Sequence, residues 1–174
     1  DEETWDRLAQ EVDGVIHNGA TVHWVRRYQD LLAANVLSTI DAMKLCNEGK
    51  PKVFTFVSST SVLDNDYYVK LSDEAISTGQ QALSEDDDMQ GSRRGLSTGY
   101  GQSKWVSEQL VREAGRRGLL GSVVRPGYVL GDSETGVCNT DDFLIRMLKG
   151  CIQLGARPRI VNTVNSVPVN HVAR

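Results

Sequence analysis

Short apolar runs alternate with long amphipathic stretches along this chain, and that alternation constrains the fold more than any other feature. Runs of strand length occur at residues 14–17, 53–57 and 122–124. Helical patterns lie between them, over about residues 28–47 and 99–116. Strands that alternate with helices of this length form right-handed crossovers and a parallel sheet. The sequence therefore predicts the α/β class with a doubly wound parallel sheet.

Two outer helices and one irregular segment complete the expected organisation. A surface helix is expected over residues 3–12, where apolar side chains recur at helical spacing. Asp141 and Asp142 are expected to begin an apolar helix, because acidic residues favour helix N-termini. Residues 59–98 are rich in Gly, Ser and Asp and lack periodicity, so we expect an irregular excursion over the surface there.

Composition narrows the class of protein. At 174 residues, with 40% apolar and 24% charged residues, the chain has the profile of one soluble globular domain. A net charge of -4 argues against a nucleic-acid partner, and no apolar run approaches the ~20 residues that cross a membrane. Three scattered cysteines, Cys46, Cys138 and Cys151, indicate free thiols and a cytoplasmic protein. No metal site is expected from the Cys and His spacing.

Both ends of the chain suggest that it continues. The sequence opens on a charged, helix-like segment at residues 1–5 and closes at residues 167–174 with no stop signal. We therefore expect residues 1–174 to be a single fragment of a longer domain, incomplete at both ends.

Tyr100 and Lys104 are the most chemically informative pair. Four residues is close to one helical turn, so both side chains are expected on the same helix face. A phenol titrates near pH ~10, and an adjacent ammonium favours the phenolate and lowers that pKa. The pair is therefore a candidate proton-transfer device, in which Ser59 orients the oxygen that receives the proton. This spacing is common by chance, so its context has to support it.

Small or polar residues follow each predicted strand. The segments are Asn18-Gly19-Ala20, Ser58-Ser59-Thr60 and Arg125-Pro126-Gly127-Tyr128-Val129. In parallel sheets ligands bind beyond the carboxyl ends of the strands, and small residues there allow close approach to the backbone. Because Tyr100 enters between the last two strands, the candidate chemistry is expected at one edge of the sheet.

Three further polar residues have structural interpretations. Asn35 lies in the apolar stripe of the helix over residues 28–47 and needs a partner. Either a tie to the loop near Ser58 or a catalytic relay would explain it. His17 and His23 have no serine or carboxylate at a telling spacing, and no Gly-x-Ser-x-Gly motif occurs. A hydrolase triad is therefore disfavoured, and both histidines are interpreted as structural.

Taken together, these motifs resemble the extended short-chain dehydrogenase/reductase family, whose sheet is Rossmann-like. Four segments are similar to thioester-reductase domains, namely residues 17–24, 58–64, 99–106 and 125–132. Such domains form the C-terminal part of carboxylic acid reductases and of some nonribosomal peptide synthetases. Within that class the resemblance is greatest to the reductase domains of fungal L-2-aminoadipate reductases, and residues 139–150 and 167–174 strengthen that choice.

The resemblance implies a role for particular residues. The implied catalytic set is Ser59, Tyr100 and Lys104, with Thr60 as the alternative to Ser59. The implied cofactor site is formed by Asn18, Gly19, Ala20, Ser58, Tyr100, Lys104, Pro126, Gly127, Tyr128 and Val129.

The resemblance also implies a reaction, a cofactor and a partner. The reaction is NADPH-dependent reduction of a phosphopantetheine-bound L-2-aminoadipyl thioester to the semialdehyde in lysine biosynthesis. NADP is the implied cofactor. An acyl-carrier domain of the same polypeptide would present the small acyl substrate on its phosphopantetheine. The fragment alone is expected to be inactive.

The chain departs from the family pattern in two places. It contains no glycine-rich phosphate loop, so a preference for NADP over NAD is implied by the resemblance alone. Asn170 stands where the family pattern has Asp. The alternatives are another carrier-bound thioester reductase, a nucleotide-sugar epimerase or dehydratase of the same fold, and a binding scaffold without turnover.

Overall fold

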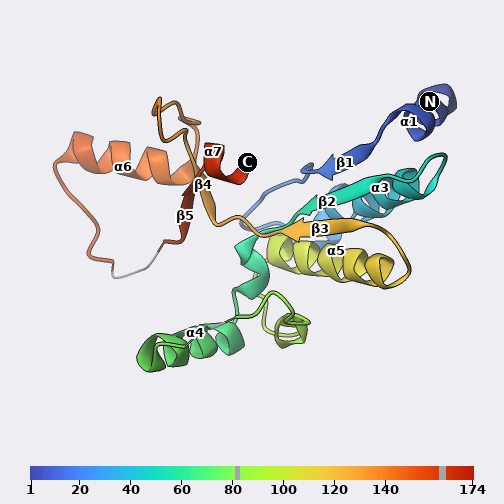
Figure 1. Cartoon of the computed structure of the whole chain (residues 1–174). Helices are drawn as coiled ribbons and strands as arrows, with labels where there is room; N and C mark the ends of the chain where they lie inside the picture. Colours follow the sequence, from blue (N-terminus) through green and yellow to red (C-terminus); the bar gives the residue numbers. More distant parts are fainter. Residues whose placement is uncertain (81–82, 161–163) are drawn as a thin grey trace. The chain divides into compact units, whose positions relative to one another are not determined.

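The computed structural model describes residues 1–80, 83–160 and 164–174, which form two compact units (Figure 1). The first unit is Asp1–Arg125 and the second is Pro126–Arg174. The first contains α1 (Glu2–Glu11), β1 (Gly14–His17), α2 (Tyr28–Leu31), the π-helical η1 (Leu32–Leu37), α3 (Ser38–Asn47), β2 (Val53–Val57), the 3₁₀ turns η2 (Thr60–Leu63) and η3 (Gln90–Ser92) with α4 (Asp66–Thr78) between them, α5 (Gly99–Arg116) and β3 (Gly121–Val124). The second contains β4 (Tyr128–Leu130), α6 (Phe143–Leu154), β5 (Ser166–Pro168) and α7 (Val169–Val172).

The first unit is built on a parallel three-stranded sheet in the order β1–β2–β3. Two helices, α3 and α5, cover one face of this sheet (Figure 1). On that face Phe54 and Phe56 of β2 are fully buried and pack with Cys46 and Val111. The opposite face is open, and Ile16 of β1 is 76% exposed. The α/β class and the parallel sheet predicted from the sequence are confirmed.

The second unit pairs β4 with β5 in parallel, with Tyr128 opposite Ser166. Asp142 begins α6, because its carboxylate accepts hydrogen bonds from the backbone N–H groups of Leu144 and Ile145. The helix predicted to begin at the two aspartates is therefore confirmed. The strands β4 and β5 have three residues each, which is too short for a periodic pattern to reveal them in the sequence.

The long helix predicted over residues 28–47 is present but not regular. Between α2 and α3 it widens into the π-helical turn η1, which contains the buried Asn35. Two hydroxyl groups, from Thr39 and Ser107, donate hydrogen bonds of 2.8 Å to the Asn35 carbonyl at this turn. Side chains that insert into the backbone hydrogen-bond ladder distort helices in this way, and π turns are frequent at functional sites.

Residues 59–98 are less irregular than predicted. They contain α4, a helix of 13 residues whose N-terminus is capped by the Asn65 side chain, which accepts from the N–H groups of Tyr67 and Tyr68. Gly79 ends the helix in the left-handed conformation, with φ of 67°. The prediction of an irregular excursion was therefore wrong for residues 66–78, where α4 buries only Tyr68 and Ala75 and so has a weak apolar pattern.

The buried face of α5 also differs from the prediction. The apolar pattern of this helix predicts that Trp105, Val106, Leu110 and Val111 face the core, but only Val111 is buried there and the other three are half-buried. The face that is buried carries mainly polar groups, namely Ser103, Lys104, Ser107 and Glu108. In the described part of the chain every buried side-chain nitrogen and oxygen has a hydrogen-bond partner, which is the condition under which such a face is stable.

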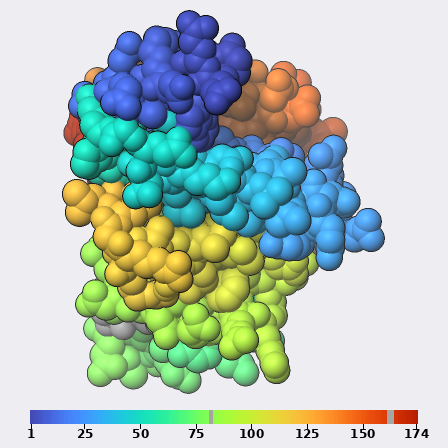
Figure 2. Space-filling view, turned by 90° about the vertical axis from the view of Figure 1, so that its right-hand side faces the viewer, coloured from blue at the N-terminus to red at the C-terminus, as the bar shows by residue number. Residues whose placement is uncertain are grey.

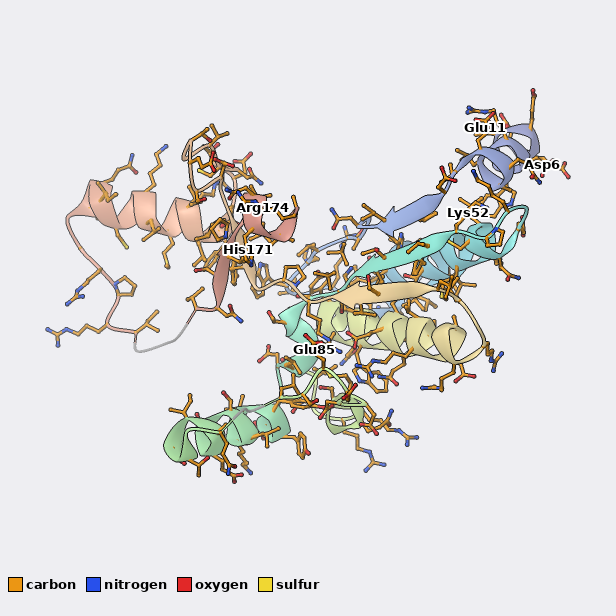
Figure 3. The ribbon with its side chains drawn as sticks, viewed as in Figure 1. Asp6, Glu11, Lys52, Glu85, His171 and Arg174 are labelled. Atoms are coloured by element: carbon orange, nitrogen blue, oxygen red, sulfur yellow. The ribbon has the colours of Figure 1, made fainter. Side chains whose placement is uncertain are left out.

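Lys52 links α1 to the rest of the first unit by hydrogen bonds. Its ammonium is buried and donates hydrogen bonds to the carbonyls of Ala9, Glu48 and Lys50 at 2.6, 2.7 and 2.9 Å. Figure 2 shows α1 in dark blue lying against the teal residues that connect α3 with β2, and Figure 3 labels Lys52 at this junction. Gly49 allows the close approach, since an added Cβ would lie 2.4 Å from the Ala9 carbonyl oxygen.

Candidate active site

Three backbone segments of the first unit meet where β2 ends. The N–H of Ser58 donates a 2.7 Å hydrogen bond to the Val124 carbonyl, so the end of β2 is held beside the end of β3. The first turn of α5 approaches the η2 turn at Gly101, where an added Cβ would lie 2.9 Å from the Ser61 carbonyl oxygen. Glycine at this position therefore lets α5 place Tyr100 next to Ser59.

The Ser59 hydroxyl lies near enough to the Tyr100 phenol to lower its pKa. The Ser59 hydroxyl is fixed by its neighbour Ser61, whose N–H it accepts at 3.1 Å and whose hydroxyl it also contacts at 3.1 Å. The structure therefore brings together two members of the predicted catalytic set.

Burial dominates the acidity of the phenol. It raises the pKa of Tyr100 above its ordinary value, and the hydrogen bond from Ser59 offsets only part of that rise. The prediction that Lys104 lowers this pKa was wrong for this structure. The physical reason is that the phenolate is disfavoured where water is excluded, and Ser59, not Lys104, provides the opposing effect.

Lys104 reaches the end of β2 one turn further along α5. Its ammonium donates a 2.7 Å hydrogen bond to the Val57 carbonyl and lies 4.8 Å from the centre of the Phe56 ring. The residue is 3% exposed, and burial lowers the pKa of Lys104 to about 8. Tyr100 and Lys104 thus face the same strand end, as their spacing predicts.

His17, at the end of β1, contacts aromatic and hydroxyl side chains, which agrees with the structural role predicted for it. Its ring stacks on Phe54 and Phe56, with centroids 6.2 and 5.9 Å apart, and its Nε2 lies 3.1 Å from the Thr39 hydroxyl. Burial lowers the pKa of His17, and the charge of Lys104 lowers it further. The other histidine, His23, accepts two backbone N–H groups of its own turn at 3.2 Å each.

Asn35 holds the loop that follows β1. Its side-chain oxygen accepts the N–H of Thr21 at 2.8 Å, and its amide donates to the Thr21 carbonyl at 3.1 Å and to the Ser103 hydroxyl at 2.9 Å. The expected tie to the loop near Ser58 is therefore wrong, because the π turn directs this side chain towards Thr21 and α5. Of the two explanations, the structure favours a structural tie, made to a different loop.

The Asn18-Gly19-Ala20 segment lies directly after β1 and is held by that tie. An added Cβ at Gly19 would meet no atom within 4 Å, so there is open space beside the loop. Ser58 is buried, and its hydroxyl points away from such space, to Glu108 at 3.0 Å. Any contact of Ser58 with a cofactor would therefore come from its backbone.

The remaining predicted cofactor residues, Pro126 to Val129, belong to the second unit. Gly127 packs against Asn165, whose carbonyl oxygen would lie 2.4 Å from an added Cβ and accepts the Tyr128 N–H at 2.7 Å. Burial raises the pKa of Tyr128. The contribution of these four residues to a shared site stays a prediction.

Asn170, in place of the expected Asp, hydrogen-bonds Ser133.

Glu108 is a member of the site region that the sequence reasoning missed. It is completely buried and hydrogen-bonded to Ser58 and Arg125. The signal was available, because Tyr100, Lys104 and Glu108 follow one another at intervals of four residues and therefore share one helix face.

A family model described as "Male sterility protein" (NAD_binding_4) matches residues 1–174. The chain belongs to this family. Its name marks a nicotinamide-dinucleotide-binding domain, which agrees with the coarser part of the cofactor prediction. In the described ranges no helix is long and apolar enough to span a membrane.

Relatives of this NAD-binding chain carry more specific names. It is 68% identical over 170 residues to the L-2-aminoadipate reductase large subunit of Penicillium chrysogenum and 61% identical over 174 residues to the L-2-aminoadipate reductase of Schizosaccharomyces pombe. These matches cover 98% and 100% of the chain but 12% of each relative.

A solved structure supports the same assignment. The terminal R domain from the myxalamid PKS-NRPS biosynthetic pathway superimposes with a TM-score of 0.84 at 40% identity, over 99% of this chain and 41% of that domain chain. The predicted resemblance to thioester-reductase domains is therefore confirmed.

Proposed function

We propose that this chain is the cofactor-binding region of an NADPH-dependent reductase that converts a phosphopantetheine-bound L-2-aminoadipyl thioester into the semialdehyde, for lysine biosynthesis. The observation that carries the proposal is the placement of the buried Lys104 on the Val57 carbonyl at the end of β2, with Ser59 near the phenol of Tyr100, one turn earlier on the same helix. The names of the relatives at 68% and 61% identity support the choice of acyl group.

Tyr100 acts as the proton donor in this proposal. Because burial raises the pKa of its phenol, Tyr100 keeps its proton at neutral pH. A neutral hydroxyl group directed at the thioester oxygen stabilises the negative charge that develops there, and Ser59 supplies a second hydroxyl. The carbon–sulfur bond then breaks, so that the pantetheine thiol leaves and the aldehyde is released.

Lys104 and the loop after β1 would hold the nicotinamide nucleotide. The donor set fits it, since an ammonium and a phenol suit the ribose hydroxyls and the loop with Gly19 has open space beside it. When bound, NADPH supplies the hydride. The positive charge of Lys104 favours the nucleotide, and its anchoring on the Val57 carbonyl keeps the ammonium within the site.

The proposed partner is an acyl-carrier domain of the same polypeptide, which delivers the acyl group on its phosphopantetheine. The relatives are long enough for this, because the chain spans 12% of their length. The three cysteines are free thiols, which supports the proposed cytoplasmic location.

Product analysis of the full-length protein tests the proposal. Aminoadipyl-loaded carrier and NADPH are supplied, and we expect the semialdehyde in amounts that match the NADPH consumed. Oxidation of NADPH only with carriers that bear other acyl groups would instead assign a different thioester reductase. Interconversion of a nucleotide sugar without net use of NADPH would assign an epimerase.

A further inference from the structure

Glu108 is a buried charge with partners on three sides. Its side chain is 0% exposed, and its carboxylate accepts the Ser58 hydroxyl at 3.0 Å and the Arg125 Nε at 2.9 Å. A second nitrogen of Arg125 also donates to it, and the Arg112 Nε donates at 3.3 Å. A carboxylate is expensive to bury, and it persists in a protein interior when its oxygens are paired as fully as these are.

The partners of Glu108 come from the ends of two neighbouring strands. Ser58 directly follows β2, and Arg125 directly follows β3. The backbone joins the same two ends, through the 2.7 Å hydrogen bond from the Ser58 N–H to the Val124 carbonyl. Glu108 therefore clamps both strand ends from α5, the helix that also carries Tyr100.

Ser58 immediately precedes Ser59, whose hydroxyl is hydrogen-bonded to Ser61 and lies near the Tyr100 phenol. With its N–H fixed on Val124 and its hydroxyl fixed on Glu108, Ser58 has little freedom to rotate. The direction in which the chain enters Ser59 is therefore set by the carboxylate. A displacement of about 1 Å in a reacting group can cost ~10²-fold in rate.

We propose that Glu108 is the positioning residue of the catalytic serine: through Ser58 it holds the Ser59 hydroxyl in register with Tyr100. The proposal rests on the proposed function, because it assigns Ser59 a part in the reduction. Glu108 itself touches no reacting atom, and its effect is carried by one hydrogen bond to a neighbouring residue.

Ser58→Ala in the full-length protein is the first test, because it removes that hydrogen bond and leaves the Glu108–Arg125 ion pair in place. We expect kcat to fall about tenfold or more, while the dissociation constant for NADPH changes less than about threefold and the melting temperature stays close to that of the unmodified protein. An unchanged kcat would overturn the proposal.

The double variant Glu108→Leu with Arg125→Leu separates positioning from packing. Apolar replacement of both partners of a buried ion pair is often tolerated, so this variant avoids an unpaired buried charge. We expect kcat to fall about 10²-fold with NADPH affinity retained. Full activity in the folded double variant would show that Glu108 has only a packing role. If it does not fold, Ser58→Ala decides alone.

Two further measurements complete the design. Glu108→Gln keeps an oxygen acceptor for Ser58, so it should retain more activity than the double variant, and equal loss in the two would count against the proposal. Glu113→Gln is the matched control on the same helix, since Glu113 pairs only with the exposed Arg116 and Arg117 in the described structure. Its kcat should stay within about twofold of the unmodified value.

These results are independent of the acyl group. Each variant is compared with the unmodified protein on an acyl-loaded carrier that the unmodified protein reduces. If that carrier is not the aminoadipyl form, the proposed substrate fails while the role of Glu108 is still measured.

Discussion

At the scale of single residues, burial shifts the pKa values of two ionisable groups of the site, Tyr100 and Lys104, away from their values in water. Burial raises the pKa of the Tyr100 phenol, and burial lowers the pKa of the Lys104 ammonium to about 8. Both shifts disfavour the charged form, as expected where water is excluded. At neutral pH Tyr100 therefore keeps its proton, and Lys104 is still charged.

The lysine gives the reaction a pH dependence with a definite sign. Lys104 loses its proton as the pH rises through about 8, so the charged form that would bind the nucleotide is depleted above that pH. We expect kcat/KM for NADPH to fall about tenfold per pH unit above about 8. A pH profile of the full-length enzyme between pH 6.5 and about 10 measures it.

Lys104→Ala is the control for that profile. It should weaken NADPH binding and turnover together and remove the fall above about pH 8, since no group then titrates at that position. If the unmodified enzyme keeps a flat profile to about pH 9.5, the proposed role of the lysine charge is wrong.

At the scale of elements, glycine decides how closely α5 approaches the η2 turn. In Gly101→Ala the new methyl group would lie 2.9 Å from the Ser61 carbonyl oxygen, which is backbone and has to move. We expect a loss of about 1–3 kcal/mol in the free energy of unfolding and of ~10²-fold in kcat, because Tyr100 moves away from Ser59.

Gly115→Ala, in the same helix, is the matched control. An added Cβ there would meet no atom within 4 Å. This variant should gain about 0.5–1 kcal/mol of stability from helix propensity and keep its activity. Denaturant unfolding and steady-state kinetics of both variants provide the comparison, and equal behaviour of the two would contradict the close-approach argument.

The hydrogen bonds that Asn35 makes from the π turn can be tested by a substitution. Asn35→Ala leaves the Thr21 N–H and the Ser103 hydroxyl without the partner that Asn35 provides. We expect a loss of about 1–3 kcal/mol in the free energy of unfolding and weaker NADPH binding, because the Asn18–Ala20 loop is released. Asn47→Ala, at the exposed end of α3, should change stability by less than about 0.5 kcal/mol. A negligible effect of Asn35→Ala on both quantities would refute the tie.

At the scale of the whole molecule, the sequence predicted what depends on periodicity. The strands over residues 14–17 and 53–57 and the helix over residues 99–116 have the bounds expected, because each has a clear apolar pattern or a glycine boundary. The proximity of Ser59 and Tyr100 was also predictable, since Ser59 follows β2 and Tyr100 lies in the first turn of the helix that connects to β3, at the same edge of the sheet.

What escaped prediction depends on contacts between distant segments. The polar face of α5 is buried because Glu108 and Ser107 hydrogen-bond with partners that lie 17 to 72 residues away in the sequence. A local sequence pattern does not reveal such contacts. The engagement of Lys104 by the Val57 carbonyl is of the same kind. The pKa of Tyr100 is raised by its own burial, which the spacing of Tyr100 and Lys104 does not reveal.

In the proposed reaction Tyr100 donates the proton during reduction of a carrier-bound thioester. Single-turnover kinetics of the full-length protein with aminoadipyl-loaded carrier and NADPH tests this role, comparing Tyr100→Phe with the same change at Tyr67, a residue that is 57% exposed. We expect a loss of ~10²–10³ in the rate of NADPH oxidation for Tyr100→Phe, with nearly unchanged NADPH affinity, and an unchanged rate for Tyr67→Phe. Semialdehyde formation by Tyr100→Phe at the unmodified rate would contradict this role.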